Sequence, residues 1–436
     1  MSSIQITALV IILLYMAATV ALGLFVSSRK KSKEAQSNDD FLMASKSLGP
    51  VVLAGTLFAA NTGGASTTGI ATNVYTYGLS AAWYVIAAGI GFVLVAQIAP
   101  FFRKAQANTV PEIISKRYGK ASHIFTAFTS IAALFLATGA QIIATASVIN
   151  VVTGLEFDIA AVITTIVVIA YTMVGGFKSV TAANLMHVLF ITVGMTIALF
   201  IMIANPQVGG FGELFAKAET ITGAQGESLD LLSMTKIGLP TIIGYIAMYY
   251  MTFPTGQEIV QTFCSAKDGK AAMTGSILAG VVSAVYAIVP ALIGLIAYTC
   301  IDGYALAGAQ KNALAEATIR FAPSIVAGLV LAAIVAATMS SASGNMIGTA
   351  TMFTNDVFVP YINKGVKDDK KEVWISRVTM VVVGAVGLVV ALVASNVISV
   401  MMGAFALRSA GPFAAFICGL FYKNVTQRAG FISIVA

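Results

Sequence analysis

Apolar stretches of about 20 residues recur along the whole chain, and this repetition limits what it can fold into. Each is long enough to cross a hydrocarbon layer roughly 30 Å thick. One soluble core could not bury them, because 58% of the 436 residues are hydrophobic, 10% are charged and the mean hydropathy is +0.90. The sequence therefore predicts a single all-α polytopic membrane domain. The predicted spans are Ile6–Val26, Gly49–Tyr75, Leu79–Phe102, His123–Ile149, Ile159–Val174, Asn184–Ala204, Gly238–Cys264, Met273–Cys300, Pro323–Phe353, Ile375–Ser395 and Ile398–Tyr422.

The two ends of the chain need separate interpretation. The stretch Ile6–Val26 has no basic residue before it and four soon after it, so we interpret it as a retained first helix rather than a signal peptide. A further stretch begins at Gly430, but only Gly430–Ala436 is present, which is too short to cross a membrane. We therefore expect the natural protein to continue beyond Ala436.

The net charge of +7 comes from Lys and Arg residues that recur in alternate loops. They form no patch interleaved with aromatic residues, so nucleic acid is not an expected partner. When the loop after Val26 is placed in the cytoplasm, most basic residues follow it there, as the positive-inside rule requires. This predicts a multi-pass protein of the cell membrane with its N-terminus outside. The exceptions are Lys217, Lys236, Lys311 and Arg320 outside and Arg408 within a span.

Helix-breaking residues interrupt two predicted spans near their middle. The breaks are Asn61–Gly64 in the second span and Phe253–Gly256 in the seventh. Because they lie five spans apart, they occupy matching positions in two units of opposite direction. Paired interruptions of this kind indicate an inverted-repeat transporter with a site at the membrane midplane. Simple kinks are the alternative, because Gly and Pro are common in membrane helices.

The predicted fold class is therefore a five-plus-five inverted-repeat helix bundle with two discontinuous helices. An extra N-terminal helix and a truncated C-terminal part complete it. A short surface helix is expected around Phe211–Thr220. The predicted segments are 1–40 (extra helix and cytoplasmic loop), 41–204 (first repeat), 205–237 (external loop), 238–422 (second repeat) and 423–436 (start of a further helix).

A hydroxyl-rich run in the ninth span is a candidate ion site. Ala337, Ser340 and Ser341 are spaced to share one helix face. Together with unwound carbonyls near Ala59 and Thr62, they offer the oxygen ligands that a hard monovalent cation prefers. Close helix packing by small residues is the alternative explanation.

An ordered set of short motifs along nearly the whole chain resembles the sodium/solute symporter family. The set is more specific than any single motif in it. It consists of Phe41–Gly49, Ala59–Asn61, Thr109–Glu112, Arg117–Gly119, Gly175–Gly176, Gln261, Ser265–Asp268, Ala337–Ser341, Thr354–Asp356 and Leu407–Gly411.

The resemblance implies sodium-driven symport of a small solute by alternating access. It also implies one principal sodium site. Some members hold a further sodium with the serines of this run and an aspartate in the sixth span, but the matching position in this chain is Asn184. We therefore predict one sodium per solute, with Ser343 free for packing. The implied sodium ligands are the carbonyls of Ala59, Thr62 and Ala337 and the hydroxyls of Ser340 and Ser341.

Departures from the sugar-transporting relatives bear on the solute. Those relatives have a glutamate in the third span, where this chain has Trp83–Ile86, and a glutamine where it has Ser66. A sugar needs many fixed polar partners, so their absence argues against one. Broken helix ends can hold a carboxylate, so we expect a monocarboxylate, an amino acid or a similar metabolite. The predicted solute-lining residues are Asn61, Ser66, Thr67, Gln141, Tyr249, Tyr250 and Thr252.

Charged residues within spans are expensive and are therefore candidates for function. Glu258 is the only carboxylate inside a span and is expected near its cytoplasmic end, which favours sodium over proton coupling. Arg408 is expected to be held by a structural partner, with a lipid headgroup or an anionic substrate as alternatives.

Other function classes fit the sequence less well. A channel should show a repeated filter, which is not present. An enzyme needs an activated nucleophile, yet His123 and His187 are predicted at cytoplasmic ends, far from the serine run. Proton-coupled transport and a transporter-like sensor stay open. Sodium, the solute and membrane lipid are the expected partners, and a monomer is expected to suffice.

Overall fold

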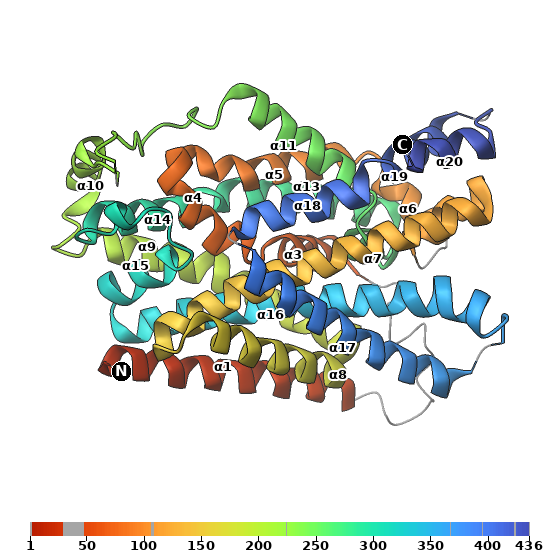
Figure 1. The fold of residues 1–436 in the computed structure, drawn as a ribbon, viewed down its shortest axis with the longest axis horizontal. Coiled ribbons are helices and arrows are strands. Elements are labelled where there is room, and N and C mark those ends of the chain that lie inside the picture. Colours follow the sequence, from red (N-terminus) through yellow and green to blue (C-terminus); the bar gives the residue numbers. More distant parts are fainter. Residues whose placement is uncertain are drawn as a thin grey trace.

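The computed structural model describes residues 2–28, 48–105, 109–223, 225–366, 368–394, 396–422 and 424–435. Nearly all of these are helical, and outside the helices the described residues form only two isolated β-bridges. Figure 1 shows long helices running side by side, with the N-terminus and the C-terminal helix at opposite ends of the bundle. The basic loop after the first helix and the motif residues Phe41–Ser47 lie outside the described residues.

The first half of the chain contains the first predicted break. Helix α3 stops at Asn61 and the chain resumes helical structure at Ala65. The elements are α1 (Ser3–Ser28), α3 (Pro50–Asn61), η2 (Ala65–Gly69), α4 (Ile70–Tyr77), η3 (Gly78–Ala82), α5 (Trp83–Val95), α6 (Ala99–Ala105), α7 (Val110–Thr153), α8 (Phe157–Leu189), η4 (Phe190–Gly194) and α9 (Met195–Ile203).

The second half contains the second break, between α11 and α12. The predicted surface helix is confirmed as α10, whereas α15 was not predicted. The elements are α10 (Gly210–Thr220), α11 (Leu239–Thr252), α12 (Gln257–Cys264), α13 (Gly269–Tyr286), α14 (Ile288–Cys300), η5 (Ala305–Ala307), α15 (Ala313–Phe321), α16 (Ser324–Met352), η6 (Phe353–Ile362), α17 (Asp369–Val393), α18 (Val397–Ser409), α19 (Pro412–Phe421) and α20 (Gln427–Val435).

Among the described residues, six helical segments are long and apolar enough to cross a membrane. The number rises to seven when α18 and α19, which meet at a bend of 44°, count as one span. Fewer segments pass this test than the sequence predicts, partly because each half of a broken helix is too short alone. The count still describes a multi-pass membrane protein.

One predicted boundary is wrong. A loop was expected at Gly175–Gly176 between the fifth and sixth spans, but α8 is helical from Phe157 to Leu189. Glycine lowers helix propensity by about 1 kcal/mol without forbidding a helix, so a Gly pair alone is a weak stop signal. The side chains of residues 171 and 174–185, including Asn184, lie outside the described part.

Burial separates a central helix from a peripheral one. The most apolar window of the α16–η6 segment is 83% buried, whereas that of α17 is 33% buried. Apolar side chains such as Val382 and Val389 project from α17 into the surroundings, as expected for a helix that faces lipid. The hydroxyl-rich run of α16 lies in the interior of the bundle, where Thr338 bonds to Thr145 of α7 and Ser341 bonds to Ala59 of α3.

Candidate functional site

Both helix breaks border one central cavity. Its volume is about 20 Å³, which is room for about one water molecule. Unwound backbone at membrane depth is stable only where it lines such a space or is buried in protein. The residues with polar side chains that line the cavity are Asn61, Tyr84, Gln141, Glu258, Ser341, Asn345 and Arg408.

The first break is held by a neutral amide from α7. The Thr62 N–H makes the last helical bond, to the Phe58 carbonyl at 2.7 Å. The Gly64 N–H instead donates to Oε1 of Gln141 at 2.7 Å. A Cβ atom at Gly63 would lie 2.3 Å from the same oxygen. The glycines therefore let Gln141 approach the backbone and satisfy a donor that the interrupted helix leaves free.

The second break is held by charge. Pro254 has no N–H to continue the helix, and Arg408 of α18 packs against Gly256, where a Cβ atom would lie 2.9 Å from the guanidinium carbon. Arg408 donates from Nε to Oγ1 of Thr252 at 2.7 Å and from Nη1 to Oε1 of Glu258 at 2.5 Å. The two halves of the interrupted helix are thus joined through one arginine.

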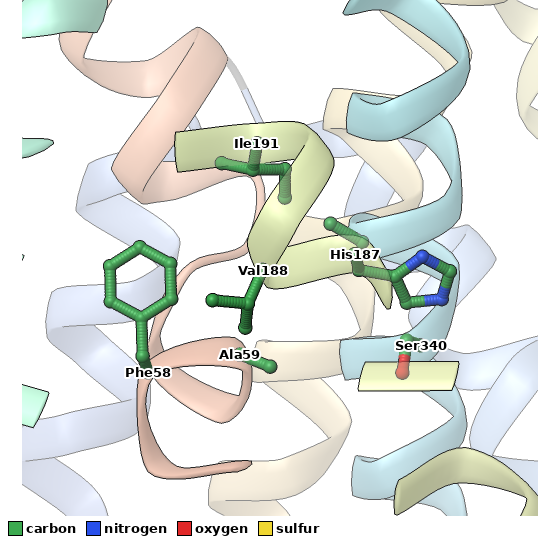
Figure 2. Close-up of a pocket in the computed structure, with 7 residues that line it drawn as sticks. Phe58, Ala59, His187, Val188, Ile191 and Ser340 are labelled. Carbon is green, nitrogen blue, oxygen red and sulfur yellow. The ribbon is translucent and has the colours of Figure 1, made fainter. Parts of the chain in front are cut away.

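A narrow cleft lies beside the first break. Ala59 of α3 faces Ala337 and Ser340 of α16 across it, and Figure 2 shows Ala59 and Ser340 on opposite sides with the imidazole of His187 directly beside Ser340. The remaining walls are the apolar side chains of Phe58, Val188 and Ile191.

Ser341 connects this cleft with the central cavity. It lines the cavity, and its Oγ donates to the Ala59 carbonyl at 3.4 Å. Thr62 is fully buried at the break, and its Oγ1 has no partner among the described residues. The structure therefore brings Ala59, Ala337, Ser340 and Ser341 together, and Thr62 follows three residues after Ala59, just beyond the end of α3. Uncharged oxygen donors of this kind fit a hard monovalent cation.

A comparison with protein families decides the class. The sodium:solute symporter family matches residues 41–436, which is nearly the entire chain. The chain belongs to the sodium:solute symporter family. Members of this family are transporters rather than enzymes, so sodium and a small solute are the partners of this symporter.

Individual relatives of the symporter agree with this assignment. The sodium/glucose cotransporter of Vibrio parahaemolyticus is 26% identical over 97% of this chain and 82% of the relative. The sodium/proline symporter of Escherichia coli strain K12 is 27% identical over 88% of this chain and 77% of the relative. A solved Na⁺-coupled sialic acid symporter superposes with a TM-score of 0.79 at 20% identity, covering 99% of this chain and 90% of the other. This likeness confirms the predicted fold class.

The predicted solute residues divide into two groups. Asn61 and Gln141 line the central cavity. Ser66 and Thr67 instead donate to carbonyls of the first break, at 2.7 and 2.9 Å. As solute ligands, all seven stay predictions. The five that do not line the cavity are Ser66, Thr67, Tyr249, Tyr250 and Thr252.

The prediction for Glu258 is wrong. It was expected near the cytoplasmic end of its span, but the structure places it in the central cavity with Arg408. The segment Phe253–Gly256 is buried, and α12 begins directly after it, so the first residues of α12 lie beside the cavity. Its position two residues after a predicted break is the signal that could have located it. The predicted structural pairing of Arg408 is confirmed by its bonds to Glu258 and Thr252.

Both histidines were expected far from the serine run, but only His123 lies away from it. His187 was expected far from the serine run, yet it shares the cleft with Ser340. Its Nδ1 lies 3.1 Å from the Tyr15 hydroxyl, and its Nε2 has no partner among the described residues. The misplaced loop before it explains this error. His123 pairs with Asp356 at 2.8 Å, away from the cleft.

Proposed function

We propose that this symporter couples sodium movement to uptake of a small carboxylate-bearing solute, an amino acid or a monocarboxylate, by alternating access. The supporting observation is the central cavity between the two breaks, where Asn61, Gln141 and Arg408 provide N–H donors. An arginine can hold a carboxylate through two parallel hydrogen bonds. The Escherichia coli relative is named for proline, an amino acid, which supports this class of solute.

In this proposal, sodium binds in the cleft beside the cavity. Its ligands are the carbonyls of Ala59, Thr62 and Ala337 and the hydroxyls of Ser340 and Ser341. Ser341 lines the cavity and donates to the Ala59 carbonyl, whose residue lines the cleft, so a solute that orders this segment also orders the ion site. Shared ordering of this kind gives the coupling free energy that makes each ligand strengthen binding of the other. One sodium ion accompanies each solute, and a monomer suffices.

The orientation of the chain is also part of the proposal. The N-terminus lies at the same end of the bundle as α10 and α15 (Figure 1), and basic loops favour the cytoplasm for the other end. Residues 41–204 and 238–422 form the two repeats. In a variant without native cysteines, Ser2→Cys should react with a membrane-impermeant maleimide in intact cells. Reaction only after permeabilisation would reverse the orientation.

A thermal-shift screen of the purified full-length protein tests the function. Amino acids, monocarboxylates, sugars and nucleosides are compared in sodium and in potassium. A ligand that binds the native state raises its apparent stability by mass action, so the expected result is a shift by an amino acid or monocarboxylate in sodium only. A shift by sugars alone would overturn the proposed solute class.

Proton coupling is the second candidate, and a specific observation favours it: Glu258 is a carboxylate inside the central cavity. Uptake into proteoliposomes under a pH gradient, without sodium, separates the two. We expect no concentrative uptake there and concentrative uptake under a sodium gradient. The reverse result would identify the proton, rather than sodium, as the coupling ion.

A further inference from the structure

The central cavity contains a buried pair of opposite charges that the sodium site does not use. Arg408 and Glu258 are joined at 2.5 Å, with side chains 4% and 18% exposed. The guanidinium also lies 4.8 Å from the centre of the Phe405 ring. The pair connects α12 of the second broken helix with α18, and both residues line the cavity. Burying two charges in this way is costly unless they stay paired.

The groups around this pair are incompletely bonded. Among the described residues, Oε2 of Glu258 and Nδ2 of Asn61 are buried without a hydrogen-bond partner. One is an acceptor with negative charge and the other is a neutral donor. Buried polar atoms normally find partners, so the cavity offers one place for a donor and another for an acceptor.

A charge count then separates the two solute classes left open above. A monocarboxylate that binds Arg408 competes with Glu258 for it and leaves two buried carboxylates with one cationic side chain between them. An amine that binds Glu258 leaves Arg408 unpaired. Either outcome incurs the penalty of an uncompensated buried charge. A zwitterion supplies both replacements at once, because its carboxylate can pair with Arg408 while its ammonium pairs with Glu258.

We propose that the Glu258–Arg408 pair recognises the zwitterionic head of an amino acid. Arg408 and Asn61 bind the solute carboxylate, and Glu258 binds its ammonium group. This inference rests on the proposed function and narrows its solute class. The apolar residues Phe253, Ile259 and Phe405 line the same cavity, so they are the neighbours of a small apolar side chain once the cavity has widened to admit the solute. Solute entry separates α12 from α18, because the solute replaces the bond that joins them.

Matched analogues test the proposal on the unaltered full-length protein. Isothermal titration in sodium compares L-proline with cyclopentanecarboxylate, which lacks the amine, and with pyrrolidine, which lacks the carboxylate. L-Alanine, propionate and ethylamine form a second set, and the other amino acids are screened for the strongest zwitterion. We expect each single-charge analogue to bind at least 100-fold more weakly than its zwitterion.

The outcomes distinguish this inference from the function beneath it. Binding of cyclopentanecarboxylate or propionate as tight as that of the zwitterion would overturn the inference and leave a sodium-coupled monocarboxylate symporter. Sodium-dependent binding of sugars alone would overturn both. Zwitterion binding that does not depend on sodium would overturn the proposed coupling while supporting the recognition element.

A charge-neutral variant adds a readout that a merely structural role would not move. Glu258→Gln keeps the side-chain volume and removes the partner of the ammonium group. We expect the affinity for the amino acid to fall at least 30-fold. The ratio of this affinity to that for the analogue without the amine should then approach one. Equal loss for both ligands would contradict the assignment. Glu316→Gln is the matched control, since Glu316 pairs with Arg320 at 3.6 Å outside the cavity, and it should leave both affinities unchanged.

Discussion

The two broken helices are stabilised at their breaks by different kinds of side chain. At the first break, a neutral glutamine from α7 accepts the freed N–H of Gly64, and the neighbouring oxygens belong to uncharged groups. At the second break, Arg408 binds Thr252 before the break and Glu258 after it. The repeats are related in fold, yet one break is polar and uncharged while the other contains an ion pair.

This difference makes the surroundings of the two breaks suited to different ligands. A cleft of neutral oxygens can bind a monovalent cation and release it again, since it does not hold the ion with a full negative charge. A buried ion pair can exchange its internal partners for those of a charged solute without leaving either charge alone. The comparison therefore predicts that damage to the glycines of the first break changes folding and that damage to the oxygens beside it changes sodium dependence. Damage to the ion pair of the second break should change solute recognition.

The largest effect is expected from Gly64→Ala at the first break. The new Cβ would lie 2.2 Å from Cβ of Ala144, a contact that backbone on both sides holds in place. Overpacking of this kind costs about 1–3 kcal/mol or more, and it would also displace the N–H that Gln141 accepts. We expect transport in proteoliposomes to fall below about a tenth of the wild-type rate.

Gly344→Ala is the matched control for this substitution. Gly344 follows the serine run on α16, and no atom outside its own helical neighbourhood lies within 4 Å of the position that the new methyl group would take. Transport by this variant should stay near wild type. Normal transport by Gly64→Ala would show that the first break does not need the close approach of α7.

A smaller and more selective effect is expected from Ser341→Ala. Its hydroxyl contacts the Ala59 carbonyl and is one of the proposed sodium ligands. The sodium concentration for half-maximal transport should rise about tenfold, equivalent to about 1.4 kcal/mol, while the solute KM at saturating sodium changes little. Ser343→Ala should leave sodium activation unchanged, because Ser343 is predicted to pack only. If the two substitutions changed sodium activation equally, Ser341 would not be a specific sodium ligand, and the proposed site would be wrong.

The sequence was sufficient for the architecture because the decisive signals are local. Span length follows from apolar runs, and each break follows from Gly or Pro residues within such a run. Span lengths and breaks do not depend on knowing which helices are neighbours. The hydroxyl-rich run and the first break offered the candidate oxygen ligands, and the resemblance implied that all five bind sodium; the structure brings four of the five together.

Tertiary contacts were harder to predict. Glu258 and Arg408 lie 150 positions apart. No local sequence pattern around either residue predicts that the two form a pair. His187 was misplaced because one Gly pair was interpreted as a loop. The side-chain bonds of Ser66 and Thr67 to nearby carbonyls also depend on how the break folds. Residue type marked these positions as polar, but only the packing shows what each one contacts.

The second break should be more tolerant of a methyl group than the first. In Gly256→Ala, the new Cβ meets the end of the Arg408 side chain at 2.9 Å rather than a helix backbone. The protein should fold, but a displaced guanidinium should weaken solute binding roughly five- to tenfold, about 1–1.4 kcal/mol. Titration of solute at saturating sodium measures this. A tenfold change in sodium activation with unchanged solute affinity would contradict the division between the breaks.

The smallest effect is expected where the first break's cleft meets the extra N-terminal helix. Tyr15 of α1 is the described partner of His187, whose ring borders Ser340. Tyr15→Phe removes one buried hydrogen bond, worth about 1 kcal/mol, and only part of that loss should reach the ion. We expect the half-maximal sodium concentration to rise about two- to threefold. Tyr298→Phe also removes a buried hydroxyl, one that donates to the Thr72 carbonyl away from the cleft, and should leave sodium activation unchanged. If both variants shift it equally, the effect is general destabilisation, and α1 then takes no specific part in the sodium cleft.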